Sequence, residues 1–214
     1  MDEPRPARHL TRNSMRALAV SLLTLLAPYA YADDVDPTPD LRRAAGLGIE
    51  AEVRYGASLD ASLAVGVVLR PDRGRLLVLR REESSGHYME EAESAEFPNM
   101  FGPRENVEIV EVTSPERFMV QVNSRTTCGI QLEHYRIARV HGRWKVAGYD
   151  RYEPDSQDCD VNQISRAYSA NLLTGQVRIT EFVHGVPTRK YGRGTKRVAP
   201  DLRNFQFDMF MIEP

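Results

Sequence analysis

The chain has 214 residues, 42% of them hydrophobic and 27% charged, with a formal net charge of −2. These values are typical of one globular domain and exclude both a disordered chain and a bundle of membrane helices. The weak negative charge also argues against a general nucleic-acid binder, which needs a basic surface for phosphates.

The N-terminus has the features of a secretion signal. Basic residues precede a short apolar run over 17–27, Pro28 ends this run, and Ala30-Tyr31-Ala32 places small residues where a signal peptidase reads them. The run is shorter than the roughly 20 residues that cross a bilayer. We therefore predict a cleaved signal peptide over 1–32, a periplasmic or secreted protein, and no transmembrane span after cleavage.

Residues 33–45 contain prolines and aspartates and predict a flexible, solvated leader. From there to the end, apolar and polar residues alternate with period two, which is typical of half-buried strands. Glycine-containing turns separate the strands, for example at His141-Gly142 and His184-Gly185. We therefore predict a single β domain over 46–214.

The predicted fold class is all-β, an antiparallel meander of about nine strands. Such a meander closes into a barrel, a sandwich or propeller-like sheets, because long exposed edges invite aggregation. The expected strands lie at 49–55, 62–70, 75–80, 107–113, 117–123, 129–140, 143–149, 167–173 and 176–183, with a short one near 188–190.

The segment 84–103 contains several glutamates and no lysine or arginine, and it also carries aromatic residues and methionines. Acids mixed with aromatics suit a contact surface, since the charge attracts a basic partner and the rings supply buried area. The alternative is a solvated loop between strands. The predicted partner-binding residues are Ser85, Tyr88, Glu90, Glu91, Glu93, Phe97 and Phe101.

The letters S-G-H-Y at 85–88 resemble the S-G-x-Y loop of periplasmic inhibitors of C-type lysozyme. The resemblance implies a loop whose Ser85 and Tyr88 enter the cleft of a glycosidase. A chance match of four letters is the alternative.

Two cysteines, Cys128 and Cys159, both lie in the part predicted to be exported. One pair in an oxidising compartment predicts one disulfide, worth roughly 3–4 kcal/mol in the chain-entropy model, and two free thiols are the alternative. Near Cys159, acidic and amide side chains have a spacing that calcium loops use. These candidate metal ligands are Asp155, Asp158, Asp160 and Asn162. The glycine and closing glutamate of an EF-hand are missing, so a polar loop is the alternative, and we predict no other cofactor.

Sequence motifs of common enzyme classes are absent, and no catalytic residue is predicted. Near the C-terminus a basic cluster surrounds Gly192 and Gly194. Its members are Arg189, Lys190, Arg193, Lys196 and Arg197. It suits either anionic cell-wall polymers and lipid headgroups or a charged, solubilising tail.

The stretch from Tyr135 to Gly175 reads Y-R-I-A-R-V-H-G-R-W-K-V-A-G-Y-D and later S-A-N-L-L-T-G. It resembles small exported β-sheet proteins of Gram-negative bacteria, some of which are periplasmic immunity proteins. The resemblance and the residues together predict a protein-binding module, an inhibitor or immunity protein that occludes a basic hydrolase or a delivered toxin with its 84–103 segment. The alternative is a periplasmic hydrolase or small-ligand-binding protein.

Overall fold

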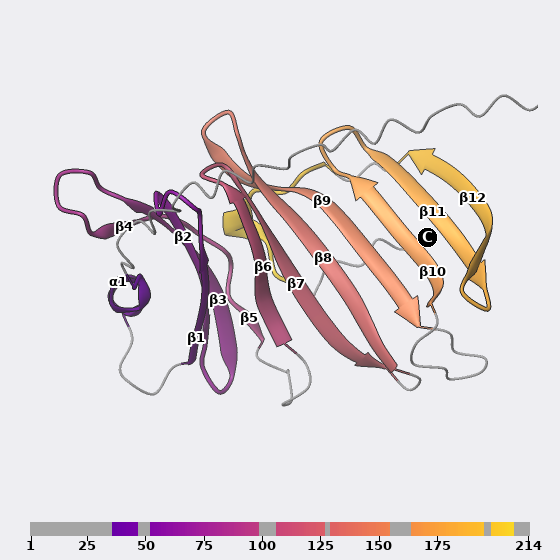
Figure 1. The fold of residues 1–214 in the computed structure, drawn as a ribbon, viewed down its shortest axis with the longest axis horizontal. Coiled ribbons are helices and arrows are strands. Elements are labelled where there is room, and N and C mark those ends of the chain that lie inside the picture. Colours follow the sequence, from indigo (N-terminus) through magenta and orange to yellow (C-terminus); the bar gives the residue numbers. More distant parts are fainter. Residues whose placement is uncertain are drawn as a thin grey trace, which may run out of the picture. The chain divides into compact units, whose positions relative to one another are not determined.

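A computed structural model of the protein describes residues 36–46, 52–98, 106–126, 129–154, 164–194 and 198–207. All of them belong to the compact unit Ala32–Pro214. Strands β1 to β12 pair antiparallel in two sheets and dominate the structure (Figure 1). The predicted all-β class is confirmed, and of the predicted closures the sandwich-like one fits. The described residues contain more strands than the nine expected.

The first sheet has five strands, and both β4 and β5 pair with β3. Its members are β1 (Glu52–Ala57), β2 (Leu63–Leu69), β3 (Arg73–Arg81), β4 (Tyr88–Glu93) and β5 (Phe97–Pro98). The predicted hairpin between β2 and β3 is present, since the Arg70 N–H donates to the Arg73 carbonyl at 2.7 Å. Strand β2 is buried at every position because both faces of this sheet are covered.

The second sheet is a meander of seven strands in which each strand pairs with the next along the chain. The strands are β6 (Asn106–Ser114), β7 (Arg117–Thr126), β8 (Gly129–Val140), β9 (Arg143–Pro154), β10 (Ile164–Asn171), β11 (Gln176–Val183) and β12 (Val186–Gly194). Two predicted turns are confirmed: His141-Gly142 has φ of 50° and 75°, and His184-Gly185 has 49° and 74°. Positive φ at both central residues matches the twist of the flanking strands.

The main core lies between the two sheets. Val65 and Leu76 of the first sheet share one apolar cluster with Val107, Phe118 and Ile137 of the second. Trp144 and Tyr149 are buried in the same cluster, and the Trp144 ring lies 5.4 Å from that of Phe118. Alternate residues of each strand build this layer, as the period-two pattern predicts.

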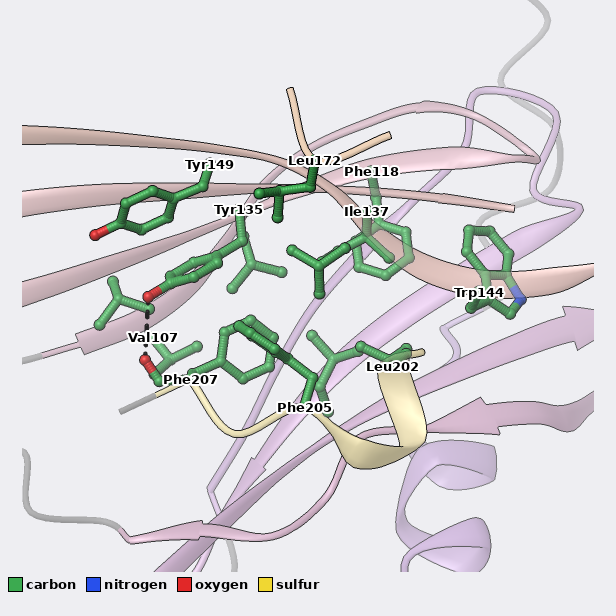
Figure 2. Packing of buried hydrophobic residues seen from close by; sticks show 14 of the residues in the cluster. Val107, Phe118, Tyr135, Ile137, Trp144, Tyr149, Leu172, Leu202, Phe205 and Phe207 are labelled. Carbon is green, nitrogen blue, oxygen red and sulfur yellow. Dashed lines mark hydrogen bonds between the residues drawn. The ribbon is translucent and has the colours of Figure 1, made fainter. Parts of the chain in front are cut away.

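Residues 198–207 close the core from the inner face of the seven-stranded sheet, and no sequence pattern predicted this. The Ala199 N–H donates to the Leu172 carbonyl at 3.2 Å, and a 3₁₀ turn follows at Leu202–Asn204. Phe205 and Phe207 then pack edge-on against Tyr135, each with ring centroids 5.3 Å away (Figure 2). Full burial of a phenylalanine side chain contributes about 1.5–3 kcal/mol, so this segment is a part of the core.

Helix α1 (Thr38–Ala44) covers the other face of the first sheet. Leu41 is fully buried and packs onto Gly66 of β2, where an added Cβ would lie 2.5 Å from the leucine side chain. The buried Asp40 carboxylate accepts the Tyr88 N–H at 2.9 Å and pairs with Arg43. The described part of the predicted leader is therefore an ordered helix and not a solvated tail.

Candidate functional site

The 84–103 segment, predicted to be a partner-binding loop, is mostly strand as far as residue 98. Tyr88 is 3% exposed, and its hydroxyl donates to the Ala61 carbonyl at 2.7 Å. Phe97 is 1% exposed and packs edge-on against Phe207 at 5.4 Å. Neither ring can contact a partner, so the prediction is wrong for these two residues. Phe101 lies outside the described residues.

The S-G-H-Y letters form the turn between β3 and β4. Ser85 is exposed, and its hydroxyl donates to the Glu82 carboxylate at 2.7 Å and accepts the His87 N–H at 3.2 Å. Gly86 has φ of 71°, a conformation that glycine adopts without strain. The turn therefore presents Ser85 to solvent and sends Tyr88 into the core, so the two residues cannot enter one cleft together.

Three of the four glutamates of this segment are paired within the chain. Val78 opposes Ala92 and Leu79 opposes Glu90, so Glu91 is the extra residue of a β-bulge. A bulge redirects a side chain, and here Glu91 meets Arg80 at 2.8 Å and Arg139 of β8 at 3.0 Å. These ion pairs connect the two sheets.

Two further acids of the segment contact arginines of β3. Glu93 pairs with Arg75 at 2.8 Å. Glu96 accepts hydrogen bonds from Arg75 and Arg73, and these bonds lower the pKa of its carboxyl. Glu90 is exposed and has no ion pair among the described residues. The predicted anionic contact surface is therefore largely neutralised by arginines that are distant in sequence.

The predicted calcium ligands Asp155, Asp158, Asp160 and Asn162 lie outside the described residues, and so do Cys128 and Cys159. Within the described residues, no group of three or more His, Cys, Asp or Glu side chains is placed to hold a metal ion. The calcium site and the disulfide stay predictions.

A polar row crosses the outer face of the seven-stranded sheet. Cross-strand pairing places Gln121 opposite His134, His134 opposite Asp150, and Asp150 opposite Ser169. The aspartate lies between the other two, and strand spacing separates His134 from Ser169 by roughly 10 Å. A Ser-His-Asp relay needs the histidine in the middle, so this row does not form one.

The partners of these side chains agree with a structural role. His134 Nε2 lies 3.0 Å from the Gln121 side-chain oxygen, and burial lowers the pKa of the imidazole. Asp150 is bound at 2.6 Å by Arg136. The row therefore connects neighbouring strands on the outer face and leaves no base poised over a nucleophile.

At its end the polar row reaches an open hollow of about 960 Å³ on β10, β11 and β12. Cross-strand pairs place Arg178 opposite both Ser169 and Gly192, and Lys190 opposite Thr180, so these residues share the outer face. Gly192 and Gly194 carry no side chain, which leaves the floor low. The polar lining is Ser169, Asn171, Gln176 and Thr180.

The charge of the hollow is positive. Among the described residues, its lining includes Arg136, Arg178, Lys190 and Arg193 and no acidic side chain. Arg136 is paired with Asp150. Arg178 and Lys190 make no ion pair with any described residue and are exposed. Such cations with hydroxyls and amides around them can bind carboxylates or other oxyanions through charge-assisted hydrogen bonds.

On the outer face, one arginine side chain crosses a glycine of the neighbouring strand and reaches the strand beyond it. Arg136 of β8 lies opposite Gly148 of β9, and an added Cβ on this glycine would be 2.3 Å from the arginine Nε. The guanidinium thus crosses β9 and donates to the Ala170 carbonyl of β10 at 2.9 Å. One glycine lets an arginine reach the second strand along.

A buried group on the inner face has a different role. The Tyr135 hydroxyl donates to the Glu133 carboxylate at 2.6 Å, and Gln131 donates to the same carboxylate at 2.7 Å. Burial raises the pKa of Tyr135 well above its ordinary value, and that of Tyr149 as well. The Tyr135 hydroxyl stays protonated at neutral pH and satisfies a buried carboxylate oxygen, which is a structural role.

The sequence indicated only some of the cations that line the hollow. It identified Arg189, Lys190 and Arg193 as a basic cluster but allowed them to be a tail, whereas they lie on β12. It missed Arg136 and Arg178 altogether. Lys190, Gly192 and Gly194 alternate with period two. This alternation predicts that they share one face of a strand and that the glycines leave a depression beside the lysine.

Comparison of the chain with protein-family models, curated proteins and solved structures found no match. Within the described part of the chain, no helix has the length and apolar character needed to cross a membrane. What the fold and the site define is an all-β, two-sheet protein with a basic hollow at one edge of its larger sheet.

Proposed function

We propose that this protein is an exported binding module that recognises an acidic segment of another protein through the outer face of β10 to β12. The observation that carries the proposal is the pair of exposed cations, Arg178 and Lys190, which border the hollow without a carboxylate partner among the described residues. The hydroxyl and amide side chains of the lining can donate hydrogen bonds to carboxylates, and they can both donate hydrogen bonds to peptide groups and accept them.

The charges make the expected partner acidic where the sequence predicted a basic one. Two of the three glutamates assigned to a basic partner are occupied, since Glu91 and Glu93 each contact arginines of this chain. The role as an inhibitor or immunity protein stays a prediction. A hydrolase or toxin bound at this face would have to present acidic groups.

A charge reversal with a matched control tests the proposal. The chain from Asp33, its Arg178→Glu/Lys190→Glu variant and an Arg117→Glu control would be compared. Arg117 is also an exposed strand arginine without an ion pair among the described residues. A labelled heptaglutamate peptide serves as the defined probe, and the same three proteins serve as baits in an envelope extract.

We expect the wild type and the control to bind the peptide, and the double variant to bind about tenfold more weakly or worse. Binding should also weaken as salt rises, because exposed charges are screened. In the extract, the relevant partner is the one that the double variant alone fails to retain. Equal peptide binding by all three proteins would overturn the proposal.

A further inference from the structure

Strand β12 is an edge of the seven-stranded sheet, and among the described residues it pairs with β11 alone (Figure 1). Pro187 and a register shift at Glu181/Phe182 interrupt the start of this pairing. From Arg189 to Gly194 the pairing is regular, with no proline and no bulge. Alternate N–H and C=O groups of this stretch point away from β11, as in any edge strand, and can pair with one more strand.

The cross-strand register of Arg136 and Gly148 recurs at this edge, although the arginine side chain does not lie over the glycine here. Arg178 of β11 lies opposite Gly192 of β12, as Arg136 of β8 lies opposite Gly148 of β9. The Arg136 guanidinium crosses its glycine to the carbonyl of a strand beyond. No Arg178 atom lies within 4 Å of a Cβ built on Gly192, so the path across this glycine is unoccupied, and beyond β12 the described residues contain no strand.

The charges of β12 indicate which kind of strand can pair with its edge. The strand has no acidic residue, and it carries Lys190 on the outer face and Arg189 and Arg193 on the inner face. A second copy of β12 would place cations against cations, which is unfavourable between neighbouring strands. A strand with carboxylates on alternate residues would instead meet a cation on either face.

We propose that β12 accepts an extended acidic segment of a partner protein as an additional strand, with Arg178 reaching across Gly192 to that strand. This inference rests on the proposed function and specifies its mode of binding. The backbone of the segment pairs with the free edge of β12 between Arg189 and Gly194. Its carboxylates, which share one face of the segment, lie beside Lys190 and Arg178 on the outer face. Strand addition of this kind draws affinity from main-chain hydrogen bonds and specificity from side chains.

Two peptides of equal charge separate strand addition from simple charge attraction. The first has nine residues and alternates glutamate with valine or threonine. The second has the same sequence but is methylated at two adjacent central backbone nitrogens, which blocks both edges of an extended peptide. We expect the methylated peptide to bind about tenfold more weakly, measured by fluorescence anisotropy at constant salt. Amide hydrogen exchange should also slow at alternate residues of 189–194 when the first peptide is bound.

The outcomes distinguish the two levels of the proposal. Equal binding of both peptides, with unchanged exchange in β12, would overturn strand addition and leave the acidic partner of the proposed function in place. Binding of neither peptide would overturn both. Slow exchange at the same amides in a concentrated sample without peptide, together with a dimeric mass, would assign the edge to a second copy and overturn the acidic segment.

Substitution of the two glycines tests the arginine span without a change of charge. Gly192→Val fills the path of Arg178, whereas Gly194→Val lies on the same face of the same strand but opposite Gln176. An added Cβ at Gly192 lies 3.3 Å from the Val177 carbonyl oxygen, so the valine needs a small local shift, and thermal unfolding would show that the fold is kept. We expect a several-fold loss of peptide affinity for Gly192→Val alone. Equal affinities of the two variants would overturn the span, and the exchange experiment on the unmodified chain decides the edge pairing if Gly192→Val does not fold.

Discussion

Two charged regions of this molecule have opposite relations to their own chain. Around β4 the acids Glu91, Glu93 and Glu96 contact arginines of β3 and β8, so their charge is balanced internally. Around β12 the cations Arg178 and Lys190 have no such balance among the described residues. The first region holds two sheets together, and the second is the region that we propose to bind a partner.

These two regions show that a run of like charges in a sequence does not reveal whether the charges are paired within the protein or exposed to solvent. Both runs are equally conspicuous in the sequence. The arginines that neutralise the acidic run come from segments up to 48 residues away from it, as Arg139 does from Glu91. Only the pairing of the strands decides which run faces solvent unpaired.

The largest expected effect concerns the segment around β4 as a structural element. Phe97→Ala should destabilise the fold by about 3–5 kcal/mol, because it removes a buried ring that packs on Phe207. Urea denaturation measures this loss. Met89→Ala, at an exposed position of the same segment, is the control. A change below 1 kcal/mol for Phe97→Ala would mean that the segment is not part of the core.

A smaller effect is expected from the ion pairs that connect the sheets. Glu91→Gln should destabilise by about 1 kcal/mol, since it removes the charge shared by Arg80 and Arg139 at a largely buried site. Glu90→Gln, at the neighbouring exposed position without an ion pair, should change the free energy of unfolding by less than about 0.5 kcal/mol. Equal effects of the two variants would contradict the internal balance of charge.

Acid should weaken the region around β4 before it affects the hollow. Hydrogen bonds from Arg75 and Arg73 lower the pKa of the Glu96 carboxyl below its ordinary value. A carboxyl with a lowered folded pKa contributes stability above its unfolded pKa and loses it as pH falls through the folded pKa. Unfolding free energy should therefore fall below about pH 4.5, and less steeply in Glu96→Gln. The exposed Glu83→Gln serves as the control, and an identical slope for all three proteins would contradict this origin.

The smallest expected effect on stability belongs to the hollow. Arg178→Glu should change the free energy of unfolding by less than about 0.5 kcal/mol, because the side chain is exposed and has no ion pair among the described residues. Thermal or urea unfolding measures it beside the peptide affinity, which should fall. A loss of stability above 1 kcal/mol would show that Arg178 supports the fold, as the arginines near β4 do.

The sequence alone determined the strands that have clear local signals. Alternation and turn chemistry located the hairpins at His141 and His184, because turn-forming glycines and period-two burial are encoded by neighbouring residues. The basic residues of β12 were noticed, although not as a strand face.

Tertiary structure alone decided the parts that depend on distant partners. Tyr88 and Phe97 are buried because helix α1 and residues 198–207 cover them from remote positions of the chain. The bulge that turns Glu91 toward Arg139 exists only in the paired sheet. The role proposed for Gly192 depends on the strand register, which places it opposite Arg178. Local patterns determine which residues form strands. Strand register and the packing of the layers depend on residues that are distant in sequence, and they determine which charges are paired inside the molecule and which stay exposed.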